Sequence, residues 1–539
     1  MKSLYREGIR VIFGLPGVQL YHAMDALYDE PGIRFITTRH EQATAYMADG
    51  FSRAGGGIGT ALMVPGPGLL NAAAAIGTAY SASSPILVLS GQIERDLIGV
   101  NRGMLHEVDD QIDCIAPITK WAKRILDPAE VPDAVHEAFF HLKTGRPRPV
   151  EIEVPWDILP NQTEIELLEK EVHPKRRPEP ADVRSAADAL AHAKRPLIWA
   201  GGGSREADLS PELLELSQVL NAPVITTPEG KGALPEDNPL SLGTIYNGHG
   251  PGHNVVPQSD VILVIGSRMH MVPQVDWSPQ PNQKLIQIDA DPEEVGRNIP
   301  VTTGMAADGR LALQDLLAEL GGKTRASQWT LEELDSIRAT TKEEIQAMAP
   351  LQVEIINSIR RELDDDAIMV SGTTEVGYWS HLAFPALTPR SYLTSSYFAT
   401  LGYAFPTALG AKVGNPDRQV VATSGDGGFG YASSELATAV QERLNVVTIL
   451  FNNESFGASY ADQENRFGGR VIGTRIHNPD YAKLAESYGA EGIKLSGHQD
   501  LRPALRDALK ADGPVLIEVP IPNLVPPFQI PAPGMIRHT

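Results

Sequence analysis

Cysteine is nearly absent from this sequence. The 539 residues contain a single cysteine, Cys114, so no disulfide can form within the chain. This composition is typical of proteins kept in a reducing compartment, and we expect the chain to be cytoplasmic. Residues 112–115 around Cys114 are mostly apolar, which predicts that the cysteine is packed in a core and is not a nucleophile.

Long apolar runs and an excess of positive charge are also missing. No uninterrupted apolar segment reaches the roughly 18 residues of a membrane-spanning helix, and the charged residues 1–8 do not resemble a signal peptide. Lys and Arg number 46 against 67 Asp and Glu, which gives a formal net charge of −21. We therefore expect neither a membrane nor a nucleic acid as a partner, although a locally positive site could still bind a small anion.

Short apolar runs alternate with helical stretches along most of the chain. This alternation predicts an α/β protein with three domains, each with a mainly parallel sheet flanked by helices. The predicted units are an N-terminal domain (1–160), a central α/β domain (181–325), a C-terminal domain (345–520) and an irregular Pro-rich tail (521–539). A charged, Pro-rich linker separates the first two domains, and residues 321–342, polar with weak helical character, separate the last two. The predicted strands include 11–13, 34–37, 60–64, 85–90, 196–200, 224–226, 261–265, 284–288, 420–423 and 446–451.

Polar residues follow two neighbouring apolar strands in the third domain. Gly425, Asp426 and Gly427 come after the strand at 420–423, and Asn453 comes after the strand at 446–451. Asp426 and Asn453 are 27 residues apart (453 − 426), which is one strand–helix–strand passage, so both should reach the same edge of the sheet. Oxygen ligands at such an edge suit a hard cation such as Mg²⁺ that also holds phosphate oxygens. Without this spacing, a tight turn would explain the Gly-Asp-Gly motif equally well.

A second set of motifs lies in the first domain. Glu41 begins a predicted helix at 40–54, where a carboxylate by itself could simply stabilise the helix dipole. It is accompanied, in chain order, by Phe13-Gly14-Leu15-Pro16-Gly17, Arg39-His40-Glu41, Pro65-Gly66-Pro67-Gly68-Leu69-Leu70-Asn71 and Gly91-Gln92.

These motifs, together with Gly-Asp-Gly, resemble the acetolactate synthase and benzaldehyde lyase branch of the thiamine diphosphate enzymes. The resemblance extends over essentially the whole chain. It implies that Asp426, Asn453 and the carbonyl of Ser455 hold Mg²⁺, and that Glu41 binds the pyrimidine ring of the coenzyme and drives it to its imine tautomer. It also implies a site formed between two subunits, and hence a homodimer at least, with a homotetramer expected.

The resemblance assigns further residues to the coenzyme. Leu401 takes the place of a large apolar residue, often methionine, that supports the bent coenzyme, although core packing is the alternative for this leucine. The other residues implied to contact the coenzyme are Pro67, Asn71, Thr374, Glu375, Gly425, Gly427, Gly428, Phe429, Phe456 and Gly457.

Substrate-facing residues depart from the two relatives. Gln19 replaces a catalytic histidine of benzaldehyde lyase, and His106 replaces a glutamine that both relatives share. A histidine at this position could bind a carboxylate or carry protons, although a structural histidine is the alternative. We predict that Gln19 and His106 are catalytic and that they line the substrate pocket together with Leu401 and Ala458.

The resemblance implies decarboxylation of a 2-oxo acid and/or carboligation, as in acetolactate synthase. The alternatives are an acyloin lyase like benzaldehyde lyase, and a non-catalytic homologue that binds the coenzyme. A nicotinamide-dependent oxidoreductase would need a glycine fingerprint that the chain lacks. In the central domain Gly201-Gly202-Gly203 could bind a nucleotide phosphate or form only a tight turn, and Arg268 resembles a flavin contact, but FAD is not favoured. The expected small-molecule partners are a 2-oxo acid, an aldehyde or an acyloin.

Overall fold

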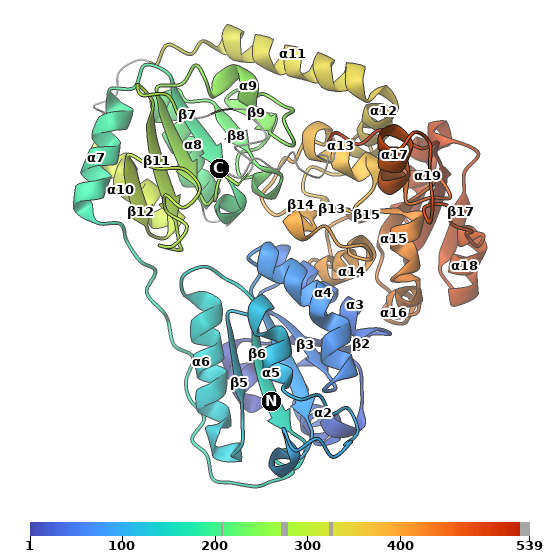
Figure 1. Cartoon of the computed structure of the whole chain (residues 1–539). Helices are drawn as coiled ribbons and strands as arrows, with labels where there is room; N and C mark the ends of the chain where they lie inside the picture. The colour runs from blue at the N-terminus through green and yellow to red at the C-terminus, as the bar shows by residue number, and fades with distance from the viewer. Residues whose placement is uncertain (206–208, 271–276, 278, 323–326, 529–539) are drawn as a thin grey trace.

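Three six-stranded sheets form the framework of the chain. The computed structural model describes residues 1–205, 209–270, 277, 279–322 and 327–528. All pairings between the named strands of these residues are parallel, and helices cover the sheets to give three lobes (Figure 1). The predicted α/β class with three parallel sheets is confirmed. Most central strands are buried on both faces, which explains their nearly continuous apolar sequences.

The N-terminal lobe has the sheet order β2-β1-β3-β4-β6-β5. Its strands are β1 (Val11–Gly14), β2 (Arg34–Thr37), β3 (Gly59–Met63), β4 (Ile86–Gln92), β5 (Trp121–Arg124) and β6 (Val150–Pro155). Its helices are α1 (Lys2–Glu7), α2 (Tyr21–Tyr28), α3 (Glu41–Arg53), α4 (Pro67–Ser81), α5 (Gln111–Ile115) and α6 (Val131–Lys143), with short 3₁₀ turns η1 (Val18–Leu20), η2 (Arg95–Leu97), η3 (Ala116–Ile118) and η4 (Pro128–Glu130). The prediction that Cys114 is packed in the core is wrong, because Cys114 lies on the exposed face of α5 while Ile115 is buried.

The central lobe has the sheet order β12-β11-β10-β7-β8-β9. This is a doubly wound parallel sheet whose strand order reverses between β7 and β10. Its strands are β7 (Pro196–Ala200), β8 (Val224–Thr226), β9 (Ser241–Thr244), β10 (Val261–Ile265), β11 (Lys284–Asp289) and β12 (Thr303–Ala306). Its helices are α7 (Pro180–Ala191), α8 (Ser210–Leu220), α9 (Gly252–Val255) and α10 (Gly309–Leu320), with 3₁₀ turns η5 (Gly202–Arg205) and η7 (Pro228–Gly230).

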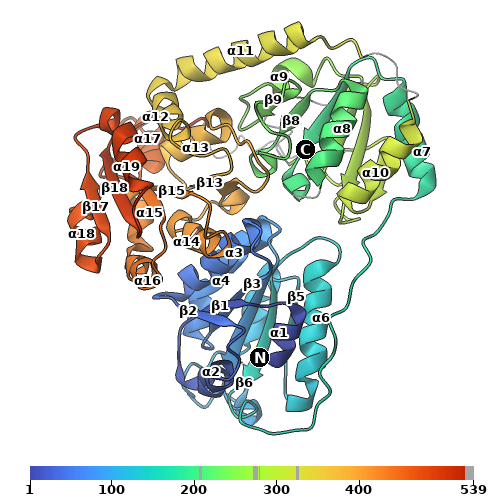
Figure 2. The ribbon, with the colours of Figure 1, turned by 180° about the vertical axis from the view of Figure 1, so that it is seen from behind.

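The second linker is more helical than the sequence predicted. Helix α11 (Leu331–Met348) has 18 residues and runs from the central lobe to the C-terminal lobe (Figures 1 and 2). Thr330 caps it by accepting a hydrogen bond from the Glu333 N–H. Only Leu334, Thr341 and Ile345 of the helix are buried, so its apolar face is narrow, and this explains why the sequence pattern was weak. Residues 323–326 of this stretch lie outside the described residues.

The C-terminal lobe has the order β14-β13-β15-β16-β18-β17, which repeats the strand order of the N-terminal lobe. Its strands are β13 (Ile368–Ser371), β14 (Tyr392–Thr394), β15 (Val420–Gly425), β16 (Val447–Asn452), β17 (Glu491–Lys494) and β18 (Val515–Pro520). Its helices are α12 (Pro350–Arg360), α13 (Glu375–Ala383), α14 (Ala404–Gly414), α15 (Asp426–Gly430), α16 (Leu436–Gln441), α17 (Gly457–Arg466), α18 (Tyr481–Tyr488) and α19 (Leu501–Ala508), with 3₁₀ turns η9 (Ser396–Phe398), η10 (Ser433–Glu435) and η11 (His498–Asp500).

The first and last lobes share one apolar core, which includes side chains from both. Helices α3 and α14 cross closely there, and two glycines make this possible. A Cβ on Gly50 would lie 2.0 Å from the Thr407 carbonyl oxygen, and a Cβ on Gly410 would lie 1.9 Å from the Met47 carbonyl oxygen. Residues 521–528 of the tail form no helix or strand, and the Val525 carbonyl accepts a hydrogen bond of 2.8 Å from Trp379 Nε1. Residues 529–539 of the predicted tail lie outside the described residues. No helix of the described part of the chain could cross a membrane.

Candidate active site

The polar residues of the C-terminal lobe gather near the point where the strand order of its sheet reverses, between β13 and β15. Open α/β sheets bind ligands at the carboxyl ends of their strands at such a point. Gly425, the last residue of β15, lies opposite Phe451 of β16, so Asp426 and Asn453 leave the sheet at the same edge. Thr374 and Glu375 follow β13 at this edge and begin α13.

Asp426 is a buried carboxylate that is 2% exposed. Its Oδ1 accepts a hydrogen bond of 2.8 Å from the Gly427 N–H, and its Oδ2 accepts one of 2.7 Å from Asn478 Nδ2. Burial raises the pKa of Asp426, and hydrogen bonds from neutral groups, including the backbone N–H groups of Glu454 and Ser455, oppose that rise. Within the described residues no ion pair joins Asp426 to a basic side chain. A buried carboxylate in neutral surroundings is well suited to a bound cation.

Asn453 and Ser455 lie beside this carboxylate. Asn453 Oδ1 accepts a hydrogen bond of 3.3 Å from the Ser455 N–H, and Asn453 Nδ2 donates one of 3.0 Å to Glu375 Oε1. The three predicted metal ligands therefore come together at one sheet edge. No group of three or more His, Cys, Asp or Glu that could hold a metal occurs among the described residues. That finding accords with a site built from one carboxylate, one amide and one carbonyl.

Glu375, which the resemblance assigns to the coenzyme, has a buried side chain next to Asn453. Burial raises the pKa of Glu375 to about 7, and the nearby charge of Asp426 adds to the rise. Gly457 leaves room for this carboxyl group, because a Cβ on Gly457 would lie 1.6 Å from Glu375 Oε1. Phe456 packs in the same way against Gly427, whose Cβ would lie 2.5 Å from the Phe456 ring.

In the N-terminal lobe, Glu41 lies beside the predicted motif of residues 65–71. Glu41 Oε2 accepts a hydrogen bond of 3.1 Å from Asn71 Nδ2 on α4. A Cβ on Gly68, in the first turn of α4, would lie 3.5 Å from Glu41 Oε1. The loop before α4 is held by Gly66, which has φ +57° and donates its N–H to Gln111 Oε1 at 2.7 Å. The structure therefore brings Glu41, Asn71 and the first turn of α4, which Pro67 begins, together.

Gln19 and His106 are also brought together. His106 Nδ1 lies 3.0 Å from Gln19 Oε1, and Gln19 Nε2 donates a hydrogen bond of 3.1 Å to the Leu105 carbonyl. His106 has φ +69°, a left-handed backbone conformation that turns the chain sharply at this residue. Gln19 is buried and His106 is half-buried.

Leu401 lies in a loop beside the Gly-Asp-Gly segment. A Cβ on Gly428 would lie 3.8 Å from Leu401 Cδ2, and one on Gly402 would lie 3.7 Å from Gln42 Oε1 of the N-terminal lobe. Residues of both segments, with Thr373 and Ser424, line a small cavity. Phe429 is buried under the segment, and Ala458 lies on α17, next to Gly457.

Three residues of this region were missed by the sequence analysis. Asn478 binds Asp426 Oδ2, and the Tyr481 hydroxyl donates a hydrogen bond of 3.0 Å to the Asp426 carbonyl. Gln111 binds the loop before α4. All three reach the site from segments that follow no motif, so no local pattern in the sequence could have indicated them.

Comparison with known proteins identifies the class that this fold and site define. Models of the thiamine pyrophosphate enzymes match the chain: the N-terminal TPP binding domain matches residues 1–114, the central domain 183–316, and the C-terminal TPP binding domain 372–519. The chain belongs to the thiamine pyrophosphate enzyme family, whose coenzyme is also called thiamine diphosphate, and the predicted resemblance is confirmed.

Within the family the chain belongs to the acetolactate synthase branch. It is 36% identical to a protein named probable acetolactate synthase large subunit from Methanocaldococcus jannaschii, over 97% of this chain and 91% of the relative. It is 34% identical to a probable 2-ketoarginine decarboxylase from Pseudomonas aeruginosa, over 96% and 92%. It is 30% identical to the acetolactate synthase isozyme 3 large subunit of Escherichia coli, over 95% and 91%.

The glycines of the central lobe pack closely against a neighbouring loop. Gly201, which follows β7, has no room for a Cβ because one would lie 2.4 Å from the Ser267 Cβ, and a Cβ on Gly203 would lie 2.8 Å from the Gly266 Cα. A tight turn thus accounts for these glycines. The Arg268 guanidinium lies 4.8 Å from the centroid of the Tyr397 ring. The flavin contact suggested for Arg268 stays an unfavoured prediction.

Proposed function

We propose that this chain is a thiamine diphosphate- and Mg²⁺-dependent enzyme that decarboxylates a 2-oxo acid and joins the remaining acyl group to a second carbonyl compound. The observation that carries the proposal is the cluster of Asp426, Asn453 and Ser455 at the carboxyl ends of the neighbouring strands β15 and β16. A buried carboxylate surrounded by neutral donors fits a cation, and the neighbouring segment of small residues fits a diphosphate group.

In this proposal the groups of the C-terminal lobe hold the metal and the coenzyme. The Asp426 carboxylate, the Asn453 side-chain oxygen and the Ser455 carbonyl bind Mg²⁺, and Asn478 keeps the carboxylate oriented. Backbone groups of Gly425, Gly427, Gly428, Phe429 and Thr374 contact the diphosphate, while Leu401 supports the body of the coenzyme. Glu375 fixes the Asn453 amide, which lets its oxygen face the metal. Phe456 and Gly457 complete the wall of the site.

Glu41 moves a proton at the pyrimidine ring of the coenzyme, and Asn71 holds the carboxyl group in place. When bound, the coenzyme would supply the electron sink for the pair released as the bond between the keto carbon and the carboxylate carbon of the 2-oxo acid breaks and CO₂ leaves. The hydrogen-bonded pair of Gln19 and His106 orients the substrate's carboxylate or carbonyl, and Leu401 and Ala458 exclude water from the pocket.

A second copy of the chain completes the site in this proposal. Large apolar side chains next to the site are exposed in the single chain: Leu70 is 45%, Leu105 60% and Tyr431 56% exposed. Contact with another copy would remove this surface from water. We propose a homodimer at least, and a homotetramer as the complete assembly. An exposed, unpaired Cys114 fits a reducing cytoplasm.

A product screen tests the proposed reaction. Purified protein with thiamine diphosphate and Mg²⁺ is incubated with 2-oxo acids or with acyloins, and the products are identified by mass spectrometry. Carboligation predicts that two 2-oxo acid molecules yield one CO₂ and one 2-hydroxy-3-oxo acid. Release of an aldehyde and CO₂ alone would make the chain a decarboxylase, and cleavage of an acyloin to two carbonyl compounds would make it a lyase. A coenzyme-saturated protein that turns over none of these compounds would overturn the proposal in favour of a non-catalytic homologue.

A further inference from the structure

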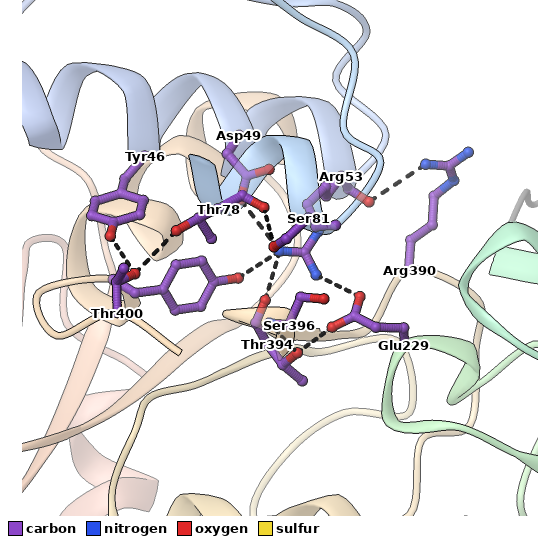
Figure 3. A network of polar contacts seen from close by, with 12 residues as sticks. Tyr46, Asp49, Arg53, Thr78, Ser81, Glu229, Arg390, Thr394, Ser396 and Thr400 are labelled. Carbon is purple, nitrogen blue, oxygen red and sulfur yellow. Dashed lines mark hydrogen bonds and ion pairs between the residues drawn. The ribbon is translucent and has the colours of Figure 1, made fainter. Parts of the chain in front are cut away.

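A buried cluster of charges lies where all three lobes meet (Figure 3). Its centre is Arg53, the last residue of α3, whose side chain is 2% exposed. Arg53 Nη1 donates hydrogen bonds to Asp49 Oδ2 at 3.2 Å, to the Thr394 carbonyl at 2.7 Å and to the Tyr403 hydroxyl at 2.9 Å. Arg53 Nη2 donates one of 3.0 Å to Glu229 Oε2 of the central lobe. One side chain therefore joins the N-terminal, central and C-terminal lobes.

Two of these partners are the two ends of one loop. Thr394 is the last residue of β14, and Tyr403 is the residue directly before α14. Between them lies the loop of residues 395–402, which carries Leu401 and Gly402 beside the Gly-Asp-Gly segment. Because a single guanidinium group binds both ends, its position determines where the loop leaves β14 and where it enters α14.

The middle of the same loop is held by hydroxyl groups. The Thr400 hydroxyl lies 2.5 Å from the Tyr46 hydroxyl and 3.0 Å from the Thr78 hydroxyl (Figure 3). Ser396 and Ala399 have positive φ angles of 55° and 52°, which such residues adopt only where their surroundings hold them. The loop conformation thus depends on these contacts and not on its own sequence.

Glu229 connects the central lobe to this loop. It forms ion pairs of 3.0 Å with Arg53 and with Arg205, and it accepts a short hydrogen bond from the Thr394 hydroxyl. The Asp49 and Glu229 carboxylates form ion pairs with the guanidinium groups of this cluster, Asp49 with Arg53 and Glu229 with both Arg53 and Arg205. Burial by itself lowers the pKa of Arg53, but Tyr403, Asp49 and Glu229 raise it by more, so the guanidinium stays charged. Removing one partner would leave a buried charge uncompensated.

We propose that Arg53 is a positioning residue for the coenzyme site. Through Thr394 and Tyr403 it determines the position of Leu401, and through Glu229 it makes this position depend on the central lobe. The part that concerns the coenzyme rests on the proposed function, in which Leu401 supports the bound coenzyme. Lysine cannot replace this arginine, because one ammonium group cannot match the fixed fork of donors that reaches four acceptors in different directions.

The test compares Arg53→Lys and Glu229→Gln with Arg195→Met as the control. Arg195 is a partly buried arginine elsewhere in the fold: its guanidinium lies 3.6 Å from the Trp329 ring centroid and pairs with Glu333, away from residues 395–402. Hydrogen–deuterium exchange of peptides covering residues 395–402 is measured first, without coenzyme. The coenzyme concentration for half-saturation and kcat are measured next, on the full-length protein.

In both Arg53→Lys and Glu229→Gln, we expect the backbone amides of residues 395–402 to exchange about 10-fold faster than in the wild type. We also expect them to need about 10-fold more coenzyme and to lose about 10- to 100-fold in kcat. Arg195→Met, compared at an equal distance below its own Tm, should leave all three quantities unchanged. If Arg53→Lys does not fold, Glu229→Gln decides, because it keeps the shape of the side chain and removes only its charge.

Unchanged exchange in residues 395–402 would overturn the proposal, since the role of Arg53 would then be only structural. Faster exchange with unchanged coenzyme binding and kcat would overturn the link from the loop to the site. If the wild type binds no coenzyme, the proposed function fails, while the exchange measurement still decides whether Arg53 controls the loop.

Discussion

Gly457 shows how much of the proposed metal site depends on the absence of one methyl group. A Cβ at this position would overlap Glu375 Oε1, which binds Asn453 Nδ2. We predict that Gly457→Ala displaces the Glu375 carboxyl group and lets the Asn453 amide turn. The Mg²⁺ concentration for half-maximal activity should then rise about 10- to 100-fold, as for other residues that orient metal ligands.

Gly430→Ala is the matched control, because no atom lies within 4 Å of a Cβ built on Gly430. It should leave the Mg²⁺ requirement unchanged. An unchanged requirement in Gly457→Ala as well would mean that Glu375 does not orient the metal ligand.

His381 predicts a pH dependence of stability. Burial lowers the pKa of His381 to about 3, helped by the charge of Lys231, and its Nδ1 lies 2.9 Å from the Tyr392 hydroxyl. Because the pKa in the folded state lies below the unfolded value of about 6.5, the unfolded chain takes up the proton first as the pH falls. The contribution of neutral His381 to the free energy of unfolding is therefore fully present above about pH 6.5. Below that pH, and down to about pH 3, it falls by about 1.4 kcal/mol per pH unit.

Urea denaturation of the wild type and of His381→Gln at pH 5, 6, 7 and 8 checks this. The difference in unfolding free energy between the two proteins should shrink by about 2 kcal/mol from pH 7 to pH 5. Parallel curves over this range would contradict a neutral, buried imidazole.

At the scale of elements, α5 is attached to the sheet by its first residue. Gln111 Nε2 donates hydrogen bonds to Ser90 Oγ, to the Gly91 carbonyl and to Glu153 Oε2, and Gln111 Oε1 accepts the Gly66 N–H. We predict that Gln111→Met removes these four hydrogen bonds of buried groups and lowers the free energy of unfolding by about 2–3 kcal/mol.

Cys114→Ser on the same helix is the control for this prediction. Its side chain is exposed, so the change should stay within about 0.5 kcal/mol in urea denaturation. Equal stability of Gln111→Met and the wild type would show that water can satisfy the groups that Gln111 binds.

The sequence predicted strands better than helices. The strands β2, β7, β8 and β10 have the predicted bounds, because buried parallel strands are short, continuous apolar runs between turn residues. The single helix expected in the strand–helix–strand passage after the Gly-Asp-Gly motif is instead the short helix α15, the 3₁₀ turn η10 and the helix α16, which ends at Gln441. The glycines at 427, 428 and 430 explain this interruption, since glycine weakens a helix.

At the scale of the whole molecule, the predicted metal ligands Asp426 and Asn453 directly follow the strands β15 and β16. Carboxyl ends of parallel strands share one edge, so Asp426 and Asn453 could be placed together from their spacing. The contacts made by Asn478, Gln111 and Glu229 could not be predicted, because each comes from a distant loop or helix that only the packing of the lobes brings near.

The proposed sharing of the site between two copies predicts that inactive variants rescue each other. Glu41→Gln and Asp426→Ala should each be inactive alone. After the two are mixed and allowed to exchange subunits, half of the dimers carry one intact site out of two, so activity should return to about a quarter of the wild type. If subunits exchange, as shown with labelled copies, and no activity returns, then Glu41 and Asp426 must act from the same chain.

The most direct test of the proposed coenzyme site is hydrogen–deuterium exchange at the thiazolium carbon of thiamine diphosphate bound to the protein with Mg²⁺. We predict fast exchange in the wild type and a rate about 100- to 1,000-fold lower in Glu41→Gln, because the carboxyl group that moves the proton at the pyrimidine ring is then missing. Equal rates in the two proteins would contradict the role given to Glu41 and, with it, the site described for this chain.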